Sequence, residues 1–224
     1  MVKQAILQSF QDRDYFPSFR NCPGEHAWDD RYLVEADPGN PESALTNKKH
    51  WCLLGEIIDA NTLIRPRIVA KDYEGHEFVV AFYPDDPNDM PRLLKNFTVG
   101  NTIAIFYPLV HGFLDGTWGI RVEDSDEVII IPLKLSEVFA MNKESIKYAA
   151  SEGNPQKCHS CDKTKDNLLK CAACESAYYC NKDCQSEGWK DKSHKRFCKA
   201  LKDKNVKWMQ FLNYKEFDGC VSFS

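Results

Sequence analysis

Cysteine is concentrated in one short stretch of the chain, where its spacing is typical of metal ligands. Ten cysteines are present in 224 residues, and seven of them fall between Cys158 and Cys198. With one histidine they form four pairs: Cys158/Cys161, Cys171/Cys174, Cys180/Cys184 and His194/Cys198. Zinc in structural sites takes four tetrahedral ligands from cysteine and histidine. Eight ligands therefore predict two closed zinc sites, with two Zn²⁺ per chain.

The spacing within each pair indicates how its members could reach one ion. C-x2-C fits a tight turn, and the third and fourth pairs, at i and i+4, are each expected to lie on one face of a helix. Asn181 is the expected N-cap of the first of these helices and Ser193 of the second. His159 lies inside the first cysteine turn, where we expect an exposed side chain, so His194 is the preferred ligand. Spacing alone leaves open whether neighbouring or alternate pairs share an ion.

These residues closely resemble the MYND zinc finger. Besides the ligand spacing, the resemblance rests on Tyr179, Gln185, Trp189 and Lys195. It implies interleaved sites, one held by Cys158, Cys161, Cys180 and Cys184, the other by Cys171, Cys174, His194 and Cys198. The sequence departs from the usual pattern in two ways. Four residues rather than two separate Trp189 from His194, and Gly188 replaces an acidic residue.

The family resemblance implies a binding role for the finger. MYND fingers bind short proline-containing peptides in a shallow groove, which Gln185, Trp189 and Tyr178 would line here. The alternative is that Trp189 only packs in the small core of the finger. The resemblance thus implies a zinc-binding interaction module or adaptor with a protein or peptide partner, in transcriptional or regulatory complexes.

The finger follows a segment whose apolar pattern predicts strands. Strands are expected at 51–58, 67–72, 77–83, 102–107, 117–122 and 127–131, with helices at 90–97 and 135–149. The expected order, in which three strands are followed by a short helix and then by further strands, is that of an OB-like barrel. The expected fold is α+β: an irregular arm at 1–45, the barrel with its C-terminal helix at 46–150, the finger at 158–198 and a C-terminal helix or tail at 199–224. Strand 77–83 is apolar on both faces, so the arm is expected to cover the barrel.

The net charge and the absence of known catalytic motifs reduce the range of functions that we expect. Residues 1–150 hold 15 Lys and Arg against 23 Asp and Glu, a net charge of −8 that disfavours binding to nucleic acid. Without a P-loop, G-x-S-x-G, H-E-x-x-H or SET-domain motif, no enzyme activity is expected. No apolar run reaches the roughly 18 residues of a membrane span. With no signal peptide at the N-terminus, an intracellular protein of the nucleus or cytoplasm is expected.

A broader and less specific resemblance covers the whole chain. Its features are the segment Trp51–Ile57, the run Ala81–Tyr83, and Phe113–Gly116 followed by Gly119–Arg121. They resemble small, uncharacterised fungal MYND-finger proteins and imply no activity. The alternative function is that of a methyltransferase-associated protein without a SET domain, or of a single-strand nucleic-acid-binding protein that uses the β-domain.

Overall fold

The computed structural model describes residues 7–37, 39–40, 44–61, 66–84, 90–150 and 155–223. The chain forms two compact units. The barrel unit comprises Phe10–Ser136 and Asn213–Ser224, and the finger unit comprises Met1–Ser9 and Glu137–Leu212. Both units therefore combine segments that lie far apart in the sequence. Within the described residues, no helix is long and apolar enough to cross a membrane.

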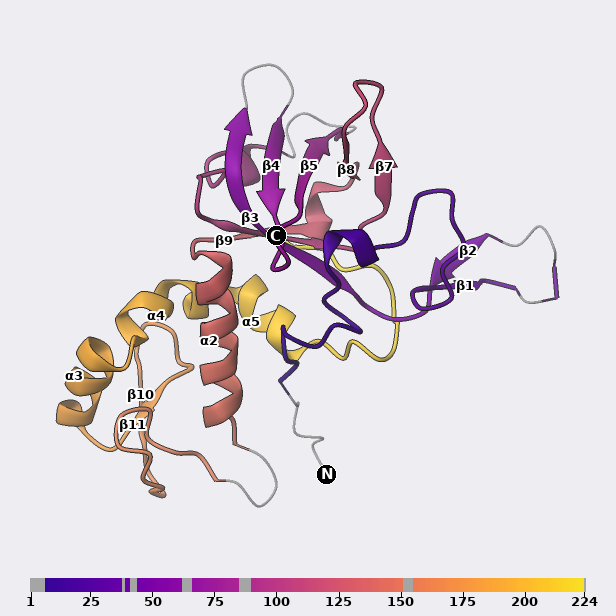
Figure 1. Cartoon of the computed structure of the whole chain (residues 1–224). Coiled ribbons are helices and arrows are strands. Elements are labelled where there is room, and N and C mark those ends of the chain that lie inside the picture. The colour runs from indigo at the N-terminus through magenta and orange to yellow at the C-terminus, as the bar shows by residue number, and fades with distance from the viewer. Residues whose placement is uncertain are drawn as a thin grey trace. The chain divides into compact units, whose positions relative to one another are not determined.

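A seven-stranded sheet builds the barrel unit (Figure 1). Its strands are β3 (Cys52–Asn61), β4 (Arg67–Lys71), β5 (Glu77–Phe82), β6 (Thr102–Phe106), β7 (Val110–Gly112), β8 (Trp118–Val122) and β9 (Val128–Ile131). Helix α1 (Pro91–Leu94) lies between β5 and β6 in the chain. Six of the strands and the helix match the segments expected from the apolar pattern, and the fold class is confirmed.

The strand pairing of this sheet is that of an OB-like fold. β3 pairs antiparallel with both β4 and β6, and the strand order is β7-β8-β5-β4-β3-β6-β9. β8 pairs parallel with β5, while β9 pairs antiparallel with β6. Because only a 3-10 turn, η3 (Ser125–Glu127), separates β8 from β9, one stretch of the chain passes from the side of β5 to the side of β6. This is the Greek-key connectivity of a small barrel with a helix between its third and fourth strands.

The described part of the N-terminal arm contributes Phe19 and Cys22 to the barrel core. Phe19, in the short helix η1 (Phe19–Asn21), stacks on Phe78 of β5 with ring centroids 4.8 Å apart. The Phe19 N–H donates to the buried carboxylate of Asp72 at 2.8 Å. The arm also contains a hairpin, β1 (Leu33–Glu35) paired with β2 (Leu45–Asn47), in the segment expected to be irregular.

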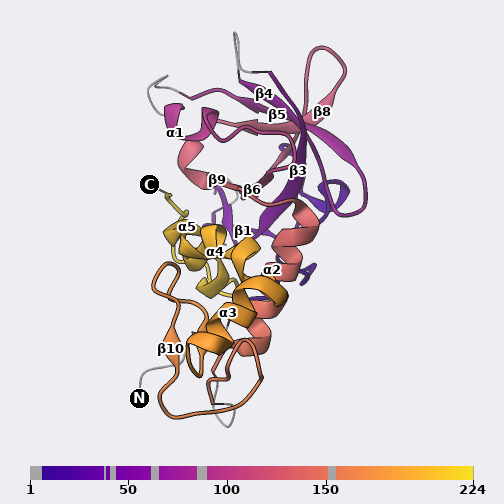
Figure 2. The ribbon, with the colours of Figure 1, turned by 90° about the vertical axis from the view of Figure 1, so that its left-hand side faces the viewer.

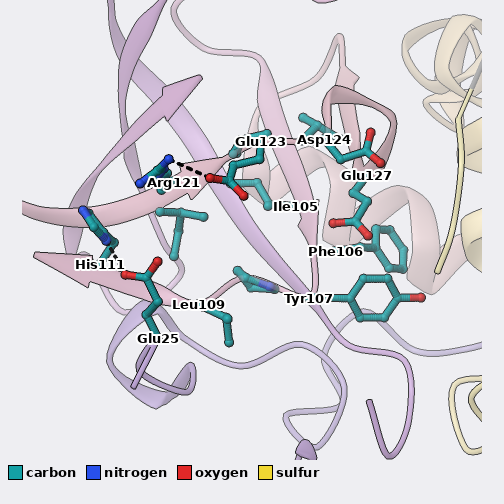
Figure 3. Close-up of a pocket in the computed structure, with 14 residues that line it drawn as sticks. Glu25, Ile105, Phe106, Tyr107, Leu109, His111, Arg121, Glu123, Asp124 and Glu127 are labelled. Carbon is teal, nitrogen blue, oxygen red and sulfur yellow. Dashed lines mark hydrogen bonds and ion pairs between the residues drawn. The ribbon is translucent and has the colours of Figure 1, made fainter. Parts of the chain in front are cut away.

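One pocket of the barrel unit has a strongly acidic lining. It has a volume of about 260 Å³ and lies beside the ends of β6 and β8 (Figure 3). Its carboxylates come from Glu25, Glu123, Asp124 and Glu127. Glu25 is in hydrogen-bond contact with the His111 ring, and Glu123 forms an ion pair with Arg121.

The finger unit consists of short strands and helices. Helix α2 (Leu135–Tyr148) enters it, followed by β10 (Leu169–Lys170), β11 (Tyr178–Tyr179), α3 (Lys182–Asp191), α4 (His194–Lys202) and α5 (Lys204–Phe211). Figure 2 shows α2 alongside α4, where Arg196 forms an ion pair with Glu137. Asp203 ends α4 and caps α5 by accepting the N–H groups of Asn205 and Val206. The small hairpin β10–β11 encloses the second cysteine pair, Cys171 and Cys174.

Candidate metal centre

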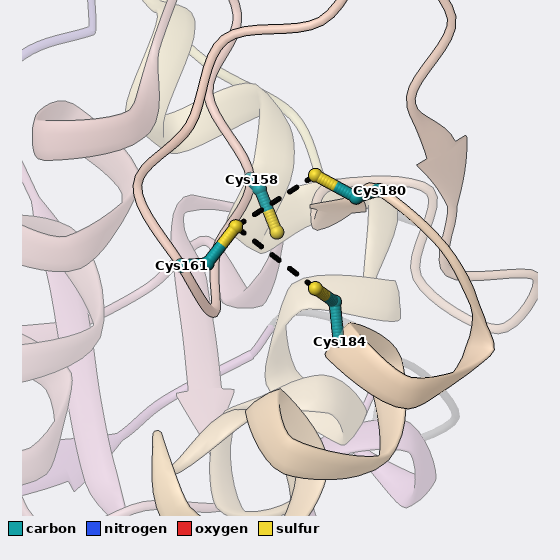
Figure 4. A group of neighbouring side chains, drawn as sticks. All are labelled: Cys158, Cys161, Cys180 and Cys184. Atoms are coloured by element: carbon teal, nitrogen blue, oxygen red, sulfur yellow. Dashed lines mark hydrogen bonds between the residues drawn. The ribbon is translucent and has the colours of Figure 1, made fainter.

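Four cysteines from the first and third pairs meet in one group. The sulfurs of Cys158, Cys161, Cys180 and Cys184 all lie within 4.8 Å of one another (Figure 4). Cys161 Sγ is 3.7 Å from Cys180 Sγ and 3.9 Å from Cys184 Sγ. Only Cys158 of this group is fully buried, so the site lies near the surface of the finger.

The second and fourth pairs form the other group. Cys171, Cys174, His194 and Cys198 also have their ligand atoms within 4.8 Å of one another, and all four residues are buried. Cys171 Sγ is 3.9 Å from Cys198 Sγ, and Cys174 Sγ is 3.7 Å from His194 Nε2. Alternate pairs thus share a site, which confirms the interleaving implied by the family resemblance.

Both groups fit zinc in size and in donor chemistry. A tetrahedral ion with Zn–S bonds of about 2.3 Å places its sulfurs about 3.8 Å apart, close to the spacings seen here. Zinc binds the thiolate form of cysteine. Hydrogen bonds from the surrounding N–H groups lower the pKa of Cys158, whereas burial and the neighbouring cysteines raise the pKa of four other thiols of the two groups. A bound cation would favour the thiolate form of all of them. The finger therefore has two zinc sites, each closed by four protein ligands.

The two C-x2-C turns have the same backbone design. In the first, the Asp162 N–H donates to Cys158 O at 3.0 Å; in the second, the Glu175 N–H donates to Cys171 O at 2.8 Å. Asp162 has φ of 59° and Glu175 φ of 57°. The residue after the second cysteine thus adopts the left-handed conformation in both turns, which lets the chain reverse while both sulfurs keep pointing at one ion.

The helices position the remaining ligands with two differences from expectation. His194 and Cys198 lie on α4, as predicted. Cys180, however, precedes α3, and only Cys184 lies on its first turn. Asn181 caps α3 as predicted, since its side chain accepts the Cys184 N–H at 2.9 Å. Ser193 does not cap α4 with its side chain. Instead it adopts φ of 61° in the connection between α3 and α4, where the sequence has two more residues after Trp189 than the family pattern.

Tyr179 fills the core of the finger. It is fully buried, and its ring lies 5.9 Å from that of His194. Gly188 of α3 makes room for it, because a Cβ at this position would lie 2.5 Å from Cε1 of Tyr179. This contact explains why glycine occupies a position where the family usually has an acidic residue.

The expected peptide-binding residues come from two elements, α3 and β11. Gln185 and Trp189 are four residues apart on α3 and so share one side of it. Trp189 is 37% exposed, and its ring centroid lies 5.6 Å from that of His194, with the two rings inclined at 60°. Neighbouring side chains of a strand point to opposite faces. Tyr178 and Tyr179 accordingly point to opposite sides of β11, and the His159 ring lies 6.1 Å from each of their rings.

His159 has a structural role that the sequence did not reveal. Its ring stacks on Tyr148 of α2 with centroids 4.1 Å apart, and its Nδ1 accepts the Tyr178 N–H at 3.0 Å. Tyr148 in turn donates its hydroxyl to Asp162 at 2.7 Å. The expectation of an exposed His159 is wrong, because α2 covers it. Since burial lowers its pKa to about 4, His159 is a neutral acceptor at pH 7.

The comparisons agree with this geometry. Residues 158–198 match the family model of the MYND finger. This segment is a MYND zinc finger. The chain therefore contains a zinc-binding protein-interaction module.

The curated relatives match this chain over a short stretch, and the chain spans less than a fifth of the length of those named here. Human "Histone-lysine N-methyltransferase SMYD1" is 40% identical over 45 residues, and human SMYD3 is 34% identical over 74 residues. Mouse "Egl nine homolog 1" is 43% identical over 52 residues. These stretches cover 20%, 33% and 23% of this chain, but only 9%, 17% and 12% of the relatives. The likeness to fungal proteins stays a prediction.

Two solved structures align with part of the chain. The S. pombe Stn1-Ten1 complex gives a TM-score of 0.30 at 12% identity, over 44% of this chain and 79% of the other. A replication protein A heterotrimer bound to single-stranded DNA gives 0.28 at 5% identity, over 50% and 80%. The OB-like assignment made above rests instead on the strand pairing.

Proposed function

We propose that the finger binds a short proline-containing peptide on the side of α3 that carries Gln185 and Trp189. The observation that supports this most directly is the exposure of Trp189. Tyr179 already fills the core of the finger, so a large part of the Trp189 indole is left at the surface. A tryptophan needed only for packing would be expected inside.

The two side chains offer complementary chemistry for such a ligand. Proline-rich segments adopt an extended helix with few conformations to lose, and they pack against aromatic rings. Trp189 supplies the ring, which contacts the zinc ligand His194. Gln185 is half-buried and carries both a donor and an acceptor for a peptide backbone. Tyr178 lies on β11 rather than on α3, and this proposal does not depend on it.

A peptide array with the zinc-loaded full chain tests the proposal. Proline-containing peptides should bind, and replacing their prolines with alanine should weaken binding. Trp189→Ala and Gln185→Ala should each reduce affinity. Trp208→Ala is the matched control, because Trp208 is another exposed tryptophan of the same unit, on α5. Equal loss in the Trp189 and Trp208 variants, or no binding at all, would contradict the proposal.

We further propose that the chain acts as an adaptor in a regulatory complex and has no enzyme activity. Each zinc site uses four protein ligands, so neither offers a position for a substrate. The human methyltransferase relatives align with this chain over 45 and 74 residues, which are 9% and 17% of their own length. Saturable binding of a methyl donor by the purified chain, or methyl transfer to a peptide that the finger binds, would contradict this part of the proposal.

A further inference from the structure

A pocket of the barrel unit gathers positive charge in an acidic surrounding. The barrel unit contains 13 Lys and Arg against 23 Asp and Glu, a net charge of −10. Yet one pocket of about 460 Å³ is lined by four cations, Arg13, Arg31, Lys48 and Lys49. Asp14 is the one carboxylate among its lining residues.

Tyrosine rings and backbone groups hold these cations in place. The Arg13 guanidinium lies 3.3 Å from the ring centre of Tyr73, which also lines the pocket. Lys48 Nζ donates to the Asp30 carbonyl at 2.9 Å. Arg31 differs from the other three cations, because Asp29 forms an ion pair with it at 2.6 Å and largely neutralises its charge.

Lys49 is the cation that most needs a counter-ion. It is half-buried, and its Nζ lies 4.7 Å from the ring centre of Tyr32 and 5.3 Å from that of Tyr15. Among the residues that the structure describes, no carboxylate comes within ion-pair distance of it. Burial lowers the pKa of Lys49 against the attraction of Asp14 and Asp12. An anion in the pocket would offset that cost of burial.

We propose that this pocket binds a phosphorylated small molecule. Its volume lies in the range of small-molecule sites, about 300–1,000 Å³, and leaves room for an organic group beside the phosphate. Arginine and lysine donors suit phosphate oxygens. The acidic surrounding disfavours a long polyanion such as single-stranded nucleic acid, but it penalises one small dianion much less. The site lies in the barrel unit and is independent of peptide binding by the finger.

Calorimetric titration of the full chain tests the proposal, with ribose 5-phosphate, inorganic phosphate and ribose as probes. Ribose 5-phosphate should bind saturably and ribose should not. Lys49→Met keeps the packing of the side-chain stem and should weaken ribose 5-phosphate binding about tenfold, the effect of losing one charge-assisted hydrogen bond. Lys71→Met is the control, because Lys71 is paired with Glu77 outside this pocket. Thermal unfolding verifies that both variants fold.

Four results would overturn the proposal. One is the absence of binding at millimolar ribose 5-phosphate, and another is equal binding by the two lysine variants. If inorganic phosphate bound as tightly as ribose 5-phosphate, the pocket would be a simple anion site. If a short oligodeoxythymidylate bound far more tightly, with the same dependence on Lys49, the pocket would belong to a nucleic-acid surface.

Discussion

Glu175 adopts a backbone conformation that favours glycine, at φ of 57° in the second cysteine turn. A left-handed conformation costs an ordinary residue roughly 1–2 kcal/mol, and a β-branched residue more. We therefore expect Glu175→Gly to preserve or raise the stability of the zinc-loaded finger. Glu175→Val should lower it by about 1–2 kcal/mol. Thermal unfolding and chelator competition measure both, and equal behaviour of the two variants would contradict the turn geometry.

Gly188 is required for a different reason, the close approach of Tyr179. Alanine would gain about 1 kcal/mol of helix propensity in α3. The steric conflict with the Tyr179 ring should outweigh this gain, so we expect Gly188→Ala to destabilise the finger by about 1–3 kcal/mol. Ser186→Ala, at an exposed position of the same helix, is the control and should be neutral or stabilising. Chemical denaturation of the zinc-loaded protein compares the two.

The residue types and spacing were enough to predict the eight zinc ligands, because each pair is a local motif. The neighbours of the site were not predictable in this way. His159 and Tyr148 are joined by the docking of α2, and nothing in either local sequence indicates that contact. Gly188 was recognised as a departure from the family, but its cause is the position of Tyr179, which only the folded finger shows.

At the level of the elements, alternating apolar residues located the strands of the barrel well. The pairing between β5 and β8 was not predictable, since these parallel strands are separated by α1 and two other strands. Gly119 makes this pairing possible, because a Cβ there would clash with the Val79 carbonyl of β5. The hairpin β1–β2 was missed because proline and glycine surround it, and those residues usually indicate irregular structure.

The turn between β8 and β9 carries a carboxyl group whose ionisation should affect stability. Burial raises the pKa of Glu127 to about 7, from 4.5. The folded barrel therefore favours the protonated form, and its contribution to stability is complete below pH 4.5 and is lost as the pH rises through about 7. Glu127→Gln imitates that form.

We expect Glu127→Gln to be more stable than the wild type at pH 8, with the difference vanishing near pH 4. Urea unfolding of the barrel unit at several pH values measures this. Glu123→Gln is the control, since Glu123 pairs with Arg121 and gains nothing from losing its charge. A constant difference between Glu127→Gln and the wild type across this pH range would contradict the account.

On the scale of the molecule, the two units depend on different sources of stability. The barrel unit has an extensive apolar core, whereas the finger is too small to fold on its core alone. Structural zinc supplies roughly 10–16 kcal/mol per site in small fingers. Removal of zinc by a chelator should therefore expose the amides of residues 158–198 to hydrogen exchange while β3, β4 and β5 stay protected. Simultaneous loss of protection in the barrel strands would show that the units do not fold independently.

The central claim is that alternate cysteine pairs share each zinc. Sequential pairing would use the same donor sets, four cysteines and three cysteines with one histidine, so stoichiometry alone does not separate the two arrangements. Replacing zinc with ¹¹³Cd and correlating each metal with the β protons of its cysteines identifies the ligands directly. We predict one ion coupled to Cys158, Cys161, Cys180 and Cys184, and the other to Cys171, Cys174 and Cys198, together with the His194 ring. A single ion coupled to both C-x2-C turns would contradict the account.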